Sequence, residues 1–281
     1  MSGVMIRGRT GTTIAIRKPD GSVQVTTQPL AQLYTGKWRE VPFIRGFIVL
    51  IETLVLGTSA LMYSAQVATE EEEEKITPAM VWGSVLLGVA LAVGLFFILP
   101  LLAARLFDPF ISSAFLSNII EGVLRIVFFI IYLLLVGRMK EIREVFAYHG
   151  AEHMSVNAFE AGVPLEMESV RRYSTAHTRC GTSFLLTVLV LSILVFALLG
   201  RPGIWLAIAS RVLLVPVIAA LSYEFIRFEA DFSHNRLVHW LMLPGLWLQA
   251  MTTRQPDEHQ LEVGITALKK TLERDGVPHN V

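Results

Sequence analysis

The residues best suited to chemistry gather in the stretch AYHGAEHMSVNAFEAG, residues 147–162. On a helix, at about 100° per residue, His149, His153 and Glu160 fall within about 40° of one another. Glu152 lies about 60° to the other side of His149. The spacing fits H-x-x-E-H, a zinc-peptidase pattern in which both histidines bind Zn²⁺ and the glutamate activates water. The alternative is an exposed helix whose histidines form hydrogen bonds with neighbouring groups.

A second pair of metal-ligand types follows in STAHTRCGTSF, where His177 and Cys180 stand at H-x-x-C spacing. Zinc accepts nitrogen and sulfur ligands of these kinds. The sequence therefore predicts a zinc site formed by His149, His153, His177 and Cys180, with Glu152 as general base. In the alternative reading Cys180 is packing and His177 braces the loop.

Three other carboxylates are weaker candidates. Glu160 shares the histidine face, and Glu224 and Glu229 follow an apolar segment that returns to the same membrane face. They are assigned as alternative ligands, or as outer residues that orient a ligand histidine.

The composition places this chemistry in a membrane. Hydrophobic residues make up 53% of the chain and charged residues 17%, which is too apolar for an ordinary soluble domain. The formal net charge of zero gives no reason to expect nucleic acid as a partner. The single cysteine excludes an internal disulfide, and the N-terminal residues show no secretory signal peptide.

The pattern predicts a mainly α, polytopic helical membrane protein with a short N-terminal β-hairpin. Alternating residues on both sides of Pro19-Asp20-Gly21 predict the hairpin. A helix needs roughly 20 apolar residues to cross a bilayer, and four segments qualify. These expected spans are 79–104, 119–137, 182–200 and 204–225.

Three further segments are expected to be helical without crossing the membrane. Residues 46–65 are ambiguous and are assigned as re-entrant or interfacial. Residues 238–250 are broken by Pro244-Gly245 and carry tryptophans, as interfacial segments do. The tail repeats Leu261, Ile265, Leu268 and Leu272, which predicts an amphipathic helix that folds back on the protein.

Charged residues inside the spans need partners. Glu121 and Arg125 stand at i, i+4 and are expected to pair. Arg211 is expected to face the helix bundle or to reach the interface.

Basic clusters set the predicted orientation. Positive residues favour the cytoplasmic side, and four crossings place all three clusters there, together with both termini and the metal site. The clusters are Arg7 to Arg45, Arg138 to Arg179 and Arg227 to Lys270. The resulting regions are 1–45 (cytosolic hairpin), 46–137 (membrane), 138–181 (cytosolic metal-site loop and helix), 182–226 (transmembrane hairpin) and 227–281 (interfacial segment and cytosolic helix).

Four sequence stretches, spread over nearly the whole chain, carry a resemblance. They are GVMIRG, YHGAEH, RCGTSF and PGLWLQAMTTRQPDEHQLEVGITALK. In combination they resemble the YqhQ-like family of bacterial membrane proteins, a family of unassigned function described as candidate metal-dependent enzymes. The resemblance implies a location in the bacterial cytoplasmic (inner) membrane and a metal. The family motif continues with lysine after the second histidine, where this chain has Met154, so Met154 is not expected to be a ligand.

Two functions fit these expectations. The first is a membrane-embedded zinc-dependent hydrolase that acts at the cytosolic face on a membrane protein segment or a lipid. The second is a scaffold, insertion factor or transport component in which a closed zinc site is structural. The lipid bilayer is the expected partner in both cases, and a homo-oligomer is left open.

Overall fold

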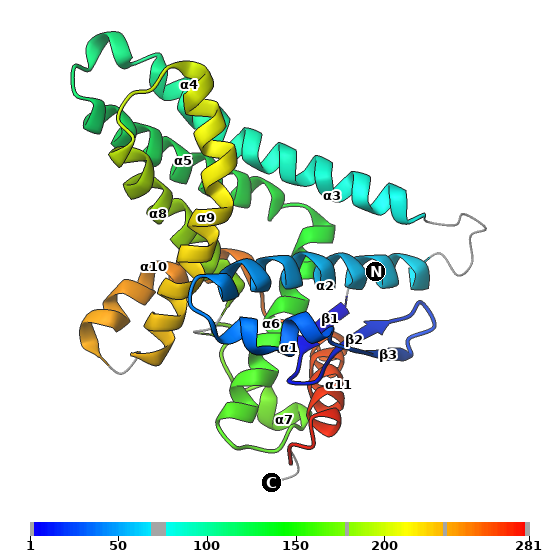
Figure 1. The fold of residues 1–281 in the computed structure, drawn as a ribbon. Helices are drawn as coiled ribbons and strands as arrows, with labels where there is room; N and C mark the ends of the chain where they lie inside the picture. Colours follow the sequence, from blue (N-terminus) through cyan, green and yellow to red (C-terminus); the bar gives the residue numbers. More distant parts are fainter. Residues whose placement is uncertain (1–2, 69–76, 178–179, 233–234, 279–281) are drawn as a thin grey trace.

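A computed structural model describes residues 3–68, 77–177, 180–232 and 235–278. Figure 1 shows long helices in the upper part of the view, and a small sheet with shorter helices below them. The fold is mainly α and polytopic, as predicted.

The N-terminal sheet has three antiparallel strands in the order β1-β2-β3, where the sequence analysis predicted only a hairpin. They are β1 (Gly3–Arg7), β2 (Gly11–Arg17) and β3 (Val23–Pro29). The predicted turn joins β2 to β3, and Gly21 adopts a positive φ of 86° there. An isolated two-stranded hairpin is marginally stable in water, so the missed strand β1 completes a sheet that buries one face.

The sheet shares a hydrophobic core with α6 (Lys140–Glu160) and α11 (Glu258–Arg274). The predicted tail stripe is confirmed, because Leu261, Ile265, Leu268 and Leu272 are all buried. Asp257 caps α11 in a capping box with Gln260. The short helix α7 (Met167–Val170) closes this unit, which we call the basal domain.

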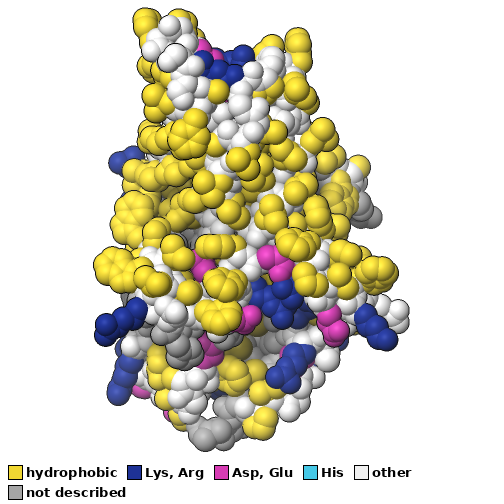
Figure 2. Space-filling model, turned by 60° about the vertical axis from the view of Figure 1, so that its left-hand side comes forward, with side chains coloured by type: hydrophobic (Ala, Val, Ile, Leu, Met, Phe, Trp, Pro, Cys, Tyr) yellow, Lys and Arg dark blue, Asp and Glu magenta, His cyan; other side chains and the backbone are white. Residues whose placement is uncertain are grey.

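Five helical segments are long and apolar enough to cross a membrane: Ile44–Ser64, Trp82–Arg105, Ala114–Val136, Gly181–Leu198 and Ile204–Glu229. They belong to α2 (Ile44–Ala68), the run α3 (Pro78–Val93), η2 (Gly94–Ile98) and α4 (Leu99–Arg105), and then α5 (Ala114–Val136), α8 (Gly181–Leu198) and α9 (Ile204–Asp231). Figure 2 shows hydrophobic side chains over the middle of the molecule and most charged ones below them. The chain is therefore a multi-pass membrane protein.

Parity limits how many of the five segments cross. The sheet, α6 and α11 share one core, so they lie on one side, and the chain must cross an even number of times between the sheet and α6. Three candidate spans lie in that interval, so one of them does not cross. Figure 1 shows α2 running across the lower ends of the other long helices, and we infer that α2 lies in the interface while four spans cross.

The contacts of α2 agree with this placement. Its buried Glu52 accepts hydrogen bonds from Arg7, at 3.0 Å, and from Arg39 in η1 (Lys37–Glu40). On its other side Ile51 and Leu61 are exposed. A helix with one charged, paired side and one apolar side is suited to the membrane surface.

The charged residues within the spans form a buried network. Glu121 accepts hydrogen bonds from Arg125 Nη2 at 2.5 Å and from Arg211 Nη2 at 2.6 Å. All three side chains are at most 3% exposed. The two guanidinium groups lie near the ring of Phe196, at 5.1 and 4.4 Å from its centroid. Both expectations for these charges, pairing within α5 and an inward-facing Arg211, are confirmed.

Helix α10 (Arg236–Thr252) is longer than its sequence suggests and continues through Pro244. The expected break at Pro244-Gly245 is therefore wrong. Gly245 lets α10 approach α8 closely, because a Cβ there would meet Ser183 Oγ at 2.7 Å. The exposed Trp240 and Trp247 suit interfacial depth. Three short helical turns complete the structure: α1 (Gln32–Thr35), η1 and η3 (Asp108–Phe110).

Candidate metal centre

Close helix packing fixes the position of α6, which carries both motif histidines. The small residue Gly150 faces the chain after α10, where a Cβ would meet Arg254 O at 2.1 Å. The next residue, Ala151, is fully buried and lies against Gly264 of α11. Any side chain larger than hydrogen at Gly150 would push α6 away, so this glycine sets the position of His149 and His153.

Backbone carbonyl groups orient both imidazoles. His149 Nδ1 lies 3.0 Å from Thr252 O, at the end of α10. His153 Nδ1 lies 2.6 Å from Thr175 O. Because a carbonyl oxygen only accepts, each Nδ1 must carry the proton and donate it. In a neutral imidazole each Nε2 then keeps its lone pair, and this is the arrangement found in histidines that bind metals.

Cys180 stands at the N-cap of α8, with its Sγ 3.3 Å from His149 Nε2. The backbone N–H of Thr182 donates to this sulfur at 3.4 Å, and Thr182 Oγ1 lies 3.3 Å from it. Burial opposes ionisation, but hydrogen bonds from His149 and His153 outweigh it and lower the pKa of Cys180 to about 5. A pKa this low favours the thiolate, the form that binds metals, and in the metal-free protein His149 Nε2 then carries the proton that it shares with this sulfur.

The contact between Cys180 and His149 also changes the pKa of His149. Burial alone would lower the pKa of His149, but the hydrogen bond and the charge of Cys180 raise it. The positive end of the α8 dipole favours the thiolate further.

The donor atoms of His149, His153 and Cys180 all lie within 4.8 Å of one another. Tetrahedral zinc with bonds of about 2.0–2.3 Å keeps such atoms about 3.4–3.7 Å apart, so the widest of these separations would need to shorten by about 1 Å for all three atoms to bind one ion. The donor set of two imidazoles and one thiolate fits zinc. We call these three residues the HHC cluster.

Glu152 lies beside the HHC cluster. Burial raises the pKa of its carboxyl group, and the two neighbouring histidines oppose that rise. A carboxylate in this position can pair with a positively charged centre or accept a proton.

The fourth predicted ligand, His177, is close to the cluster but points elsewhere. Its ring centroid lies 5.7 Å from that of His153. Its Nε2 lies 3.3 Å from a carboxylate oxygen of Glu160. The side chain of Gln249 fixes the His177 backbone, because it accepts from His177 N at 2.9 Å and donates to His177 O at 2.8 Å. Three of the four predicted donors converge, and the fourth pairs with one of the predicted outer carboxylates.

The other two carboxylates lie in different contacts. Glu224 accepts hydrogen bonds from the guanidinium of Arg45 and, at 3.1 Å, from Phe43 N. Glu229 lines a pocket between α8, α9 and α10. Neither belongs to the HHC cluster.

Four positioning groups had no motif to mark them: the carbonyls of Thr175 and Thr252, the Gln249 side chain and Thr182. Every residue has a backbone carbonyl, so the residue type does not show which carbonyl will contact a histidine. Gln249 left a weak signal, since it is a fully buried amide in the apolar run LWLQAM, where such a group requires partners.

Cys180 is the chain's only cysteine, so alkylation reports on it alone. In the metal-free protein iodoacetamide should react at a rate that changes little between about pH 8 and pH 6, because the attacking thiolate persists well above a pKa of about 5. Saturating zinc should protect Cys180 from alkylation, and the Cys180→Ser variant measures the background labelling. Tenfold acceleration per pH unit above pH 7 would indicate an ordinary thiol. Undiminished alkylation in zinc would indicate a thiolate–imidazolium pair that binds no metal.

Comparison with known proteins agrees with the resemblance noted in the sequence. The chain is 30% identical over 288 residues to "Uncharacterized protein YqhQ" of Bacillus subtilis (strain 168), covering 97% of this chain and 90% of that protein. No solved structure matches the chain. The family described as "Protein of unknown function (DUF1385)" matches residues 41–274, which include the HHC cluster and every candidate span. The chain therefore belongs to the DUF1385 family.

Proposed function

We propose that the protein is a zinc-dependent hydrolase embedded in the bacterial cytoplasmic membrane, with the HHC cluster as its metal centre. The observation that carries this proposal is the pair of Nδ1 contacts to backbone carbonyls, which direct both Nε2 atoms and Cys180 Sγ to one point. Histidines that only stabilise a helix surface have no need for this shared orientation.

The number of converging donors favours catalysis over a structural site. Structural zinc sites have four protein ligands, and catalytic sites have three and an open position. Among the described residues, the HHC cluster supplies three donors, while His177 Nε2 pairs with Glu160. This pairing weakens the alternative of a closed zinc site in a scaffold or transport component.

Each residue then has a defined role. Zinc, when bound, supplies Lewis acidity at its fourth position. Glu152 accepts a proton from the attacking water and passes it to the leaving group. Thr175 and Thr252 hold the imidazoles through their carbonyl oxygens, and Thr182 stabilises the thiolate. The substrate is a membrane protein segment or a lipid, because the centre lies where the basal domain meets the membrane helices.

We assign the basal domain, both termini and the HHC cluster to the cytoplasmic side. The shared core keeps these parts together, and the basic clusters of the sequence favour the cytoplasm. A membrane-impermeant thiol reagent should label a Ser155→Cys variant, made in Cys180→Ser background, only after the cells are opened and the protein is denatured. Denaturation is needed because Ser155 is fully buried. The exposed control Glu144→Cys should react as soon as the cells are opened, without denaturation.

The direct test of the metal is elemental analysis of the purified protein. We expect about one zinc per chain in the wild type, and none in the variant combining His149→Ala with His153→Ala, because one remaining thiolate cannot hold zinc tightly. Gln249→Ala is the matched control, since it loosens the His177 loop without removing a donor of the cluster. Stoichiometric zinc in the double variant would end the proposal.

A further inference from the structure

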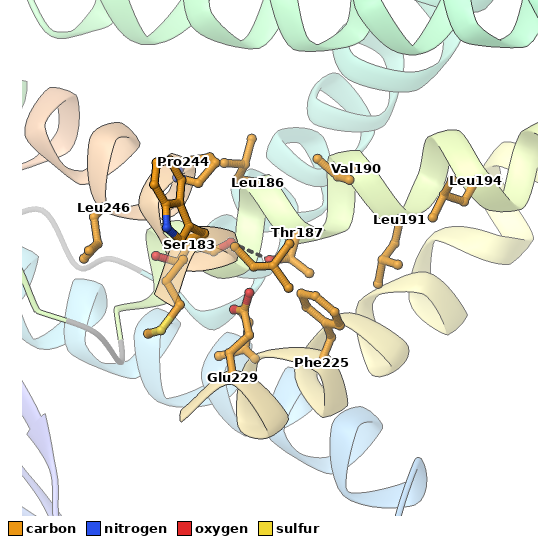
Figure 3. Close-up of a pocket in the computed structure, with 15 residues that line it drawn as sticks. Ser183, Leu186, Thr187, Val190, Leu191, Leu194, Phe225, Glu229, Pro244 and Leu246 are labelled. Carbon is orange, nitrogen blue, oxygen red and sulfur yellow. Dashed lines mark hydrogen bonds between the residues drawn. The ribbon is translucent and has the colours of Figure 1, made fainter. Parts of the chain in front are cut away.

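A pocket opens between α8, α9 and α10, on the membrane side of the HHC cluster. Its volume is about 330 Å³. Figure 3 shows Leu186, Leu191 and Phe225 along its walls, with the Glu229 carboxyl group pointing inward, towards Thr187. The lining is apolar except for a few side chains at one end.

Glu229 is the unexplained group in this pocket. Its side chain is 7% exposed. Among the described residues it has no hydrogen-bond or ion-pair partner, whereas Glu224, about one turn earlier on α9, is paired with Arg45. Burying an unpaired carboxylate costs several kcal/mol. A ligand that brings a cation to Glu229 would remove this cost.

The position of the pocket indicates where such a ligand comes from. Trp240, Leu241 and Leu194 line it and are more than half exposed, so its mouth faces the lipid. Tryptophan on this surface marks the depth of lipid head groups. The pocket therefore opens at the level where acyl chains meet their head groups.

We propose that this pocket binds a phospholipid with a primary amine in its head group, such as phosphatidylethanolamine, whose ammonium group pairs with Glu229. Ser183 supplies a second contact: its hydroxyl accepts from Gln249 Nε2 at 3.1 Å, which leaves its own proton to donate to a phosphate oxygen. The volume is equivalent to about ten water-sized groups, enough for the head group and the first carbons of a chain. The rest of the lipid stays in the bilayer.

This inference does not depend on the metal centre, so its test is run in a zinc chelator. Native mass spectrometry of the detergent-purified protein would measure the dissociation constants of phosphatidylethanolamine and phosphatidylcholine with identical acyl chains. The choline group is similar in charge but has no N–H to donate. We expect the wild type to prefer phosphatidylethanolamine by about tenfold, the equivalent of about 1.4 kcal/mol.

Three variants locate the site. Glu229→Gln should reduce the preference to less than about threefold, because a neutral amide does not attract the ammonium group. Asp231→Asn, an exposed carboxylate on the same helix, should keep the wild-type preference. Val190→Trp, at an exposed lining position, should fill the mouth and weaken the binding of both lipids.

Equal affinity for the two lipids in the wild type would overturn the proposal. A preference that survives in Glu229→Gln would do the same. If Glu229→Gln does not fold, Val190→Trp decides between the outcomes: wild-type affinity for phosphatidylethanolamine refutes the pocket as the site, and weakened binding of both lipids supports it.

Discussion

Glu152→Gln is expected to keep its zinc and its fold and to lose function. Glutamine preserves the size and hydrogen-bonding capacity of the side chain but removes the carboxylate that accepts the proton. Removal of a general base lowers the rate by about 10²–10⁴-fold, so the variant should fail to restore growth or membrane phenotype in a deletion strain. The measurements are complementation at matched expression, and zinc content of the same preparations.

The matched control is Glu144→Gln, which changes an exposed carboxylate on the same helix and should complement normally. Cys180→Ser separates the remaining possibilities, because it removes a metal donor and should impair both zinc content and complementation. Full complementation by Glu152→Gln would exclude the hydrolase and leave a structural zinc site as the better account.

Glu121→Ala should be the most destabilising single substitution in the membrane region. It leaves the guanidinium groups of Arg125 and Arg211 buried at 1% exposure with no carboxylate between them. Breaking a buried ion network by removing one partner costs about 3–5 kcal/mol. Thermal unfolding in a fixed detergent should show a large fall in melting temperature, and expression should fall with it.

The complementary experiment removes the whole network. The triple variant Glu121→Leu, Arg125→Met, Arg211→Met replaces the charges with apolar groups of similar volume, which is often neutral or stabilising. It should recover most of the stability lost in Glu121→Ala. If the single variant melts like the wild type, the network contributes little. If the triple variant melts below the single one, the arginines stabilise the bundle through contacts other than Glu121.

The sequence predicted the features that depend on residue type and period. Apolar length identified the spans, the tail stripe identified α11, and i, i+4 spacing identified the Glu121–Arg125 pair. The features it missed depend on position in space. Strand β1 is short and is completed only by pairing with β2. The sequence left residues 46–65 ambiguous and assigned them as re-entrant or interfacial, and the ion pairs of α2 with the N-terminal region favour the interface.

The candidate metal centre likewise combines features that the sequence predicts with features that depend on the folded structure. Helical periodicity brought His149, Glu152 and His153 to one region, and the nearby cysteine completed a plausible ligand set. Spacing could not determine which ring nitrogen points inward, because that depends on carbonyl groups of Thr175 and Thr252 far away in the chain. Nor could it show that His177 pairs with Glu160, since this follows from the Gln249 contacts to the His177 backbone.

The basal domain joins the beginning, the middle and the end of the chain. Asp275 accepts hydrogen bonds from the backbone N–H groups of Arg9, at 2.5 Å, and Thr10, at 3.0 Å, and α11 packs against the helix that carries both histidines. During synthesis, β1 and α6 leave the ribosome before α11 does, so the histidine helix can be covered only after α11 has emerged. Contacts between such distant segments form slowly. A chain whose translation stops before α11 would insert its spans but leave one face of the histidine helix uncovered.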